Sequence, residues 1–121
     1  MIVLMLYNHK CTKHKDKTVK IISMIPEGGD RHDLPVEYSD ATNFNARFKR
    51  MHRDKLSRTV DTGHRNYFHY CFNRIPTVKE NSCLQTFPVD FVWCGSKVHQ
   101  NIQVGNSVPP IIGESIGACL Y

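Results

Sequence analysis

Residues 108–120 carry an apolar helical face that the rest of this short chain offers little to cover. The side chains recur with the spacing of one face of a helix and are apolar except for a single serine: Val108, Ile111, Ile112, Ser115, Ile116, Cys119 and Leu120. Pro109 and Pro110 fit the first turn of such a helix, where a missing N–H costs little. Because no long buried-strand run accompanies this helix, we expect it to pack against another polypeptide.

The length and composition describe one small globular domain. A chain of 121 residues with 40% hydrophobic and 22% charged residues can bury a core, but only a marginal one. Its formal net charge of +5 suggests a polyanionic partner. The positive charge falls in two clusters within the first half of the chain: Lys10, Lys13, Lys15, Lys17 and Lys20, then Arg47, Lys49, Arg50, Arg53, Lys55 and Arg58. Two interpretations of these clusters remain open, a nucleic-acid face and two solvated basic stretches.

The same sequence argues against several other classes of protein. The apolar opening at residues 2–6 is too short to span a membrane and lacks the features of a secretory signal, so a cytoplasmic location is expected. The five cysteines are odd in number and widely spread, which argues against a disulfide framework. His9, Cys11 and His14 are close in sequence but lack a Cys-x-x-Cys pair, so no metal site is expected.

Local signals predict two helices before the last one. The first covers residues 18–25, and Pro26 together with the Gly28-Gly29 pair terminates it. The second begins with the T-x-x-E form of a capping box, in which Thr77 and Glu80 satisfy each other's backbone N–H groups. This helix is expected to stop before the Phe-Pro pair that follows it.

The expected strands are short and few. We expect them over residues 2–7, 59–62 and 67–72, the last two paired with each other. Residues 30–45 contain a proline and several turn formers, and they are expected to be irregular. Helices with a few short strands make this an α+β chain.

Two segments go beyond composition. Residues 74–91 read R-I-P-T-V-K-E-N-S-C-L-Q-T-F-P-V-D-F and resemble the ninth conserved motif of DNA (cytosine-5) methyltransferases, R-x-x-T-x-R-E-x-A-R-L-Q-x-F-P-D-D-F. Residues 103–110, Q-V-G-N-S-V-P-P, are similar to the tenth and last motif of that family, Q-x-G-N-[AS]-V-P-P. Upstream, residues 8–35 and 50–60 resemble the target-recognition region of one bacterial branch with less force. Two specific motifs in the right order argue strongly against a chance likeness.

The resemblance implies a fold and a division of the chain. Residues 1–72 would be part of a target-recognition region, and residues 73–121 would carry motifs nine and ten back to the catalytic domain. The fold class is then an α+β fragment. In the family, its C-terminal helices complete a doubly wound, Rossmann-like methyltransferase domain. The last helix packs there beside the first strand, which would explain its uncovered apolar face.

The family's catalytic elements are missing from these residues. The chemistry needs a Pro-Cys nucleophile, a Glu-Asn-Val motif and a Gly-rich loop for S-adenosylmethionine, and it acts on a flipped base. No proline precedes a cysteine here, and Glu80-Asn81 is followed by Ser82. We therefore expect no catalytic residue in this chain and no activity from it alone. A complementary chain would supply the nucleophile.

Two functions remain open on the sequence. The first is the C-terminal portion of a DNA (cytosine-5) methyltransferase, which contributes target recognition and part of the cofactor pocket. The second is an inactive truncated remnant with residual non-specific DNA binding. Lys79, Cys83 and Val89 replace the usual Arg, Arg and Asp of motif nine, which suggests relaxed constraint unless they are compensated locally.

The resemblance also implies site residues. Asn106, Ser107 and Val108 would contact S-adenosylmethionine once the complementary half is present, although Asn106 or Ser107 could simply cap a helix. The residues expected to bind double-stranded DNA are Gly28, Gly29, Arg50, Lys55, Arg58 and Thr59. The glycines would enter the major groove and the others would contact phosphates. The alternatives are a helix-terminating turn, a solvated basic face and an ordinary strand residue. We expect a bacterial protein with no membrane segment.

Overall fold

The computed structural model describes residues 6–39, 48–63 and 67–120. The chain divides into two compact units. We call Cys11–Thr59 with His64–Pro76 the arginine unit, and Met1–Lys10, Val60–Gly63 and Thr77–Tyr121 the tryptophan unit, after a buried residue in each. In the described part of the chain, no helix is both long and apolar enough to cross a membrane. The helices and the small sheet form a small α+β structure, as expected.

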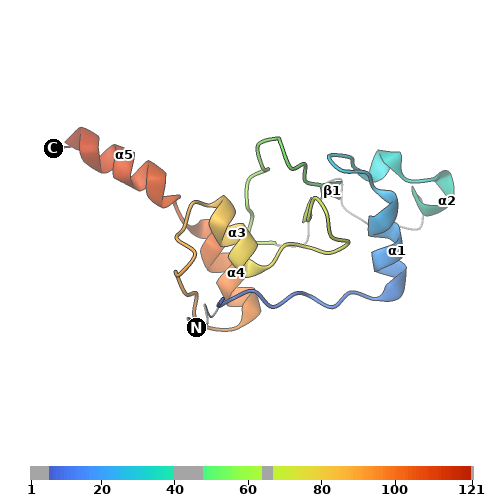
Figure 1. Cartoon of the computed structure of the whole chain (residues 1–121), viewed down its shortest axis with the longest axis horizontal. Helices are drawn as coiled ribbons and strands as arrows, with labels where there is room; N and C mark the ends of the chain where they lie inside the picture. The colour runs from blue at the N-terminus through green and yellow to red at the C-terminus, as the bar shows by residue number, and fades with distance from the viewer. Residues whose placement is uncertain (1–5, 40–47, 64–66, 121) are drawn as a thin grey trace, which may run out of the picture. The chain divides into compact units, whose positions relative to one another are not determined.

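The arginine unit contains most of the short elements (Figure 1). In chain order they are α1 (Asp16–Met24), η1 (Arg31–Asp33), α2 (Val36–Ser39), β1 (Lys49–Arg50) and β2 (Tyr67–Phe68). The predicted first helix is confirmed as α1, which has Asp16 in its first turn. Within the segment expected to be irregular, η1 and α2 each form a short turn of helix, and residues 40–45 lie outside the described residues.

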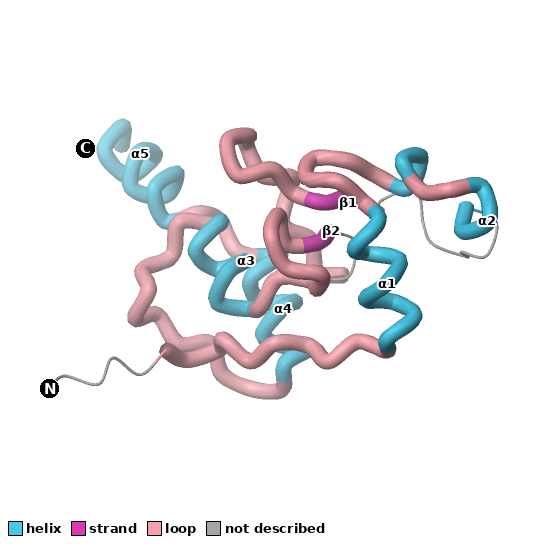
Figure 2. Tube along the Cα trace, turned by 45° about the vertical axis from the view of Figure 1, so that its right-hand side comes forward, coloured by secondary structure: helices cyan, strands magenta, loops and turns pink. Residues whose placement is uncertain are grey.

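The predicted strand pairing is wrong. The strand β2 pairs in parallel with β1, with Lys49 opposite Tyr67 and Arg50 opposite Phe68 (Figure 2). Residues 59–62 form no strand, and most of the strand expected over residues 2–7 lies outside the described residues. The partner of β2 is a basic segment that residue type alone does not mark as a strand. Arg50 in this segment is buried and donates a hydrogen bond inside the unit. Long-range contacts thus outweigh the local preference of Thr and Val for a strand.

The core of the arginine unit lies between α1 and the two strands. Its buried apolar residues are Ile21, Ile22, Ile25, Leu34, Phe48, Phe68 and Ile75. Phe48 and Phe68 meet edge to face with their ring centroids 4.2 Å apart. The helix α1 therefore buries one isoleucine-rich side and leaves the other side to water.

The tryptophan unit is helical. Its elements are α3 (Val78–Leu84), α4 (Lys97–Asn106) and α5 (Pro110–Leu120). The predicted capping box is confirmed at α3, where Glu80 N donates to Thr77 Oγ1 at 3.2 Å and Thr77 N donates to Glu80 Oε2 at 2.8 Å. Helix α4 was not predicted, although Ser96 caps it through His99 N.

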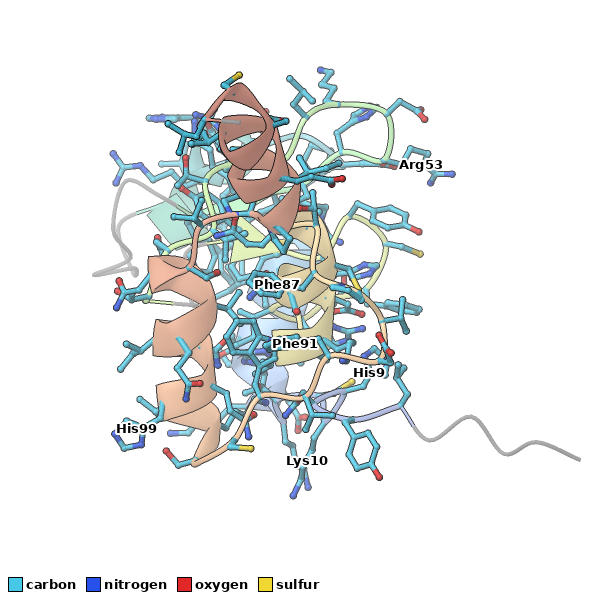
Figure 3. All side chains as sticks on the ribbon, turned by 90° about the vertical axis from the view of Figure 1, so that its left-hand side faces the viewer. His9, Lys10, Arg53, Phe87, Phe91 and His99 are labelled. Atoms are coloured by element: carbon cyan, nitrogen blue, oxygen red, sulfur yellow. The ribbon has the colours of Figure 1, made fainter. Side chains whose placement is uncertain are left out.

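Trp93 lies at the centre of this unit. It is buried with Val78 and Val104, and Phe87 packs against the cluster. Its indole Nε1 donates to Ser82 Oγ at 2.8 Å. The rings of Phe87, Phe91 and Trp93 contact one another with centroids 4.8–5.0 Å apart, and Figure 3 shows Phe87 and Phe91 between α3 and α4.

Helix α5 leaves its apolar face uncovered, as the sequence predicted. None of its described residues is buried. Ile111 is 60% exposed and Ile116 is 55% exposed. In Figure 1, α5 extends away from α3 and α4 of the same unit. The apolar face of α5 is therefore open to solvent in this structure.

Candidate nucleic-acid and cofactor sites

An open depression of about 260 Å³ brings several predicted DNA-binding residues together in the arginine unit. Gly28, Arg50, Lys55 and Arg58 all line it. Asp30, Lys49, His52 and Tyr67 also contribute to its wall. We call this feature the recognition depression.

The glycine pair forms a turn that is bonded to β1. Gly28 has a φ of +77°, a conformation that favours glycine, and its N–H donates to Met51 O at 3.2 Å. The carbonyl of Gly29 accepts from Arg50 N at 2.9 Å. A Cβ at Gly29 would lie 2.7 Å from Pro26 Cγ. The turn both follows α1 and edges the depression, so a structural role and a DNA-contacting role are compatible.

Arg50 is buried inside the unit, although it also contributes to the lining of the recognition depression. It is 6% exposed, and its guanidinium donates to Ile22 O at 2.6 Å, His69 O at 3.2 Å and Asn73 Oδ1 at 2.7 Å. Burial lowers the pKa of Arg50 from its ordinary value. The observed role of Arg50 is to tie the turn at residues 69–73 to the end of α1, so its guanidinium is engaged within the unit.

A carboxylate–guanidinium clasp holds the loop at residues 52–59, which we call the basic loop. Arg53 Nη2 lies 3.1 Å from Glu27 Oε2, and Arg53 N donates to Glu27 Oε1 at 2.7 Å. The hydrogen bond from the Arg53 side chain is the main cause that holds the pKa of Glu27 below its ordinary value. The clasp therefore forms at neutral pH and is lost only as pH falls below the ordinary glutamate range. Glu27 directly precedes Gly28, so the clasp joins the basic loop to the glycine turn.

The basic loop is open to solvent beyond this clasp. Lys55, Arg58 and Thr59 are exposed, and Leu56 is 100% exposed. The loop thus presents the remaining predicted phosphate-binding side chains to solvent. The sequence did not reveal Glu27 and Arg53 as the residues that anchor it, because their pairing joins positions that are far apart in the chain.

In motif nine, Lys79 has a defined place in the structure. It is 3% exposed, and its ammonium donates to Val89 O at 2.8 Å and Phe91 O at 2.6 Å. Lysine at this position therefore holds the turn that follows α3, which is a local compensation for the usual arginine. Cys83 and Val89, the other two replacements, are both exposed.

The motif-ten residues lie at the junction of α4 and α5. Asn106 is the last residue of α4 and is exposed. Ser107 follows as the C-terminal cap, and its Oγ donates to Val104 O at 2.6 Å. Val108 is 63% exposed. The junction therefore presents one amide and one apolar side chain to solvent, with Ser107 used to end α4.

The glycine of motif ten has a packing role that the sequence did not indicate. A Cβ at Gly105 would lie 2.6 Å from Thr62 N and 2.7 Å from Asp61 C, closer than real contacts allow. Residues 60–63 can lie against α4 only because no side chain projects there. Only the folded structure brings these two segments together.

We expect Gly105→Ala to destabilise the chain by about 1–3 kcal/mol, because backbone atoms must move to admit the methyl group. Urea unfolding followed by circular dichroism measures the change. Gly113→Ala in α5 is the matched control, since a Cβ there meets nothing within 4 Å and alanine favours a helix. Equal stability of the two variants would contradict the packing role of Gly105.

The comparisons with known proteins agree with these motifs. The family model for C-5 cytosine-specific DNA methylase matches residues 4–121, and the chain belongs to this family. It is 38% identical to Type II methyltransferase M1.HphI of Haemophilus parahaemolyticus over 93% of its own length and 30% of that protein. It is 34% identical to M.NgoFVII of Neisseria gonorrhoeae over 85% of its length and 29% of that protein. The chain thus spans less than a third of these two relatives.

A third relative is much shorter than the other two, since its match with this chain covers most of its length. Type II methyltransferase M.AquIB of Picosynechococcus sp. is 32% identical over 90% of this chain, and the match covers 83% of M.AquIB. That relative is therefore only slightly longer than this chain.

Proposed function

We propose that this chain is the C-terminal portion of a DNA (cytosine-5) methyltransferase, and that a separate chain supplies the nucleophile. The observation that carries the proposal is a family match over residues 4–121 that includes motifs nine and ten but no Pro-Cys or Glu-Asn-Val sequence. The short length of M.AquIB supports a division of the enzyme between two chains. Such a pair would act in the bacterial cytoplasm as part of a restriction-modification system.

Target recognition falls to the arginine unit in this proposal. The turn at Gly28 and Gly29 reaches base edges in the major groove, and Lys55, Arg58 and Thr59 contact phosphates beside it. Support comes from the shared position of the turn and the basic loop at the recognition depression. Base-edge contacts give specificity and phosphate contacts fix the register. The clasp between Glu27 and Arg53 keeps the two elements in one arrangement.

The motif-ten junction would form one wall of the cofactor pocket. The exposed amide of Asn106 and the exposed side chain of Val108 fit a ligand with polar and apolar parts, and Ser107 holds the junction in place. S-adenosylmethionine supplies the methyl group in this family. The remaining walls belong to the complementary chain, so we expect tight cofactor binding only in the assembled pair.

Residues 73–121 would then return to the catalytic domain. We propose that α3, α4 and α5 complete a doubly wound, Rossmann-like domain on the partner. The uncovered apolar face of α5 is the surface that packs against it. The part of residues 1–72 that lies in the arginine unit would remain with the target-recognition region.

The alternative is an inactive remnant with residual non-specific DNA binding. The replacements at Cys83 and Val89 favour it, since both side chains are exposed and have lost the charge that the motif usually carries. The buried hydrogen bonds of Lys79 weigh against it. Loss of selection would not preserve an ammonium group that donates to two backbone carbonyls.

A methyl-transfer assay separates the two. Radiolabelled S-adenosylmethionine and mixed-sequence duplex DNA are incubated with this chain, with a neighbouring chain that carries Pro-Cys and Glu-Asn-Val, and with both. We expect incorporation only in the mixture. Incorporation by this chain alone would overturn the assignment of the nucleophile, and none in any tube would favour the remnant.

A further inference from the structure

The lysines around the start of α1 form an exposed basic surface outside the recognition depression. Lys13 and Lys15 precede the helix, and Lys17 and Lys20 lie on it. We call these four residues the lysine strip; all of them are exposed. The opposite side of α1 is buried in the core, so the strip occupies the solvent side of this segment.

The charges of the strip differ from those at the recognition depression. Beside the depression, Lys49 lies 3.6 Å from Asp30, and Arg53 lies 3.1 Å from Glu27. Among residues 6–39, 48–63 and 67–120, neither ion pair includes a lysine of the strip. Lys20 lies over the ring of Tyr38, with its Nζ 6.0 Å from the ring centroid. Cations already paired with carboxylates gain less from a phosphate than cations without a carboxylate partner.

An open pocket of about 320 Å³ lies beside the strip. Polar residues, including Lys13, Lys15 and Thr18, share its lining with the apolar residues Phe48, Phe68 and Ile75. Lys13 and Lys15 thus border a partly apolar pocket, and a nucleic-acid strand presents both phosphates and deoxyribose carbons.

We propose that the lysine strip is a second DNA-contacting surface, which binds the sugar–phosphate backbone outside the bases that the recognition depression reads. The inference rests on the proposed function. It assigns two different roles in DNA binding to two surfaces of the arginine unit. The strip supplies sequence-independent affinity through released counterions, and the depression supplies the preference for a target.

The test measures duplex affinity against salt concentration for the full chain and for Lys13→Gln/Lys15→Gln/Lys17→Gln/Lys20→Gln. Glutamine has a helix propensity close to that of lysine, so the fold is retained. On mixed-sequence DNA, we expect the slope of log K against log salt to become shallower by roughly 2–4, since each phosphate contact contributes about 0.9. Affinity at low salt falls at least about tenfold, whatever the DNA sequence.

Two controls decide the cause. The four lysines changed to arginine keep the charge, and this variant is expected to bind like the wild type. Arg31→Gln removes one cation of the same unit outside the strip and the depression, and it is expected to leave the slope nearly unchanged. A glutamine variant with the wild-type slope, or an arginine variant as weak as the glutamine variant, would overturn the DNA-contacting role of the lysine strip. Neither result would contradict the proposed function. A wild-type chain that binds no duplex at low salt would overturn the proposed function as well.

Discussion

Arg50→Met is expected to lower the free energy of unfolding by roughly 2–4 kcal/mol, because it leaves buried acceptors without their donor. The carbonyl of Ile22 and the side-chain oxygen of Asn73 each accept a short hydrogen bond from Arg50, at 2.6 Å and 2.7 Å. The turn at residues 69–73 and the end of α1 would lose their common link. Urea unfolding followed by circular dichroism gives the change in midpoint.

Arg50→Lys separates this structural role from a phosphate contact. A lysine keeps the positive charge but lacks the planar guanidinium whose separate N–H groups reach several acceptors at once. We therefore expect the Arg50→Lys variant to be nearly as unstable as the methionine variant. Arg53→Met is the control, because Arg53 is exposed and its loss leaves the core intact. If Arg50→Lys has wild-type stability and only Arg50→Met loses DNA affinity, the phosphate role holds and the structural one fails.

Ile112→Glu/Ile116→Glu is expected to abolish methyl transfer by the assembled pair while the chain itself stays folded. Both side chains lie on the uncovered face of α5, at 48% and 55% exposure. Charges there cost the isolated chain little, since no described α5 residue is buried. On a partner, the same charges would have to enter an apolar interface, which costs several kcal/mol. We expect at least a hundredfold loss of association.

The measurement is the binding of the two chains by titration calorimetry, with methyl transfer as a second readout. Glu114→Lys is the control, because residue 114 lies on the other side of α5 and the change should leave association intact. Equal loss for Glu114→Lys, which shifts the charge in the opposite direction, would mean that association does not depend on the apolar face in particular. Undiminished association of the double variant would exclude the apolar face as the docking surface.

Local signals in the sequence are enough to predict several elements. The capping box at Thr77 and Glu80, the end of α1 just before Pro26, and the apolar period of α5 each depend on residues within a few positions of one another. The two family motifs are likewise continuous stretches of sequence, so they indicate the family without tertiary information. The uncovered face of α5 is predictable for the same reason, since its period is a local property.

Tertiary structure alone decided which charges are structural. Arg50 and Lys79 are both buried and donate to backbone carbonyls, Arg50 to Ile22 O in α1 and Lys79 to the turn that follows α3. The same holds for the pairing of β1 with β2 and for Gly105 against residues 60–63. Residue type and local spacing report periodicity and capping, but burial depends on which segments meet across the chain. Burial is therefore a property of the fold. For this reason Arg50 is buried and Arg58 is exposed, although both belong to the same basic cluster in the sequence.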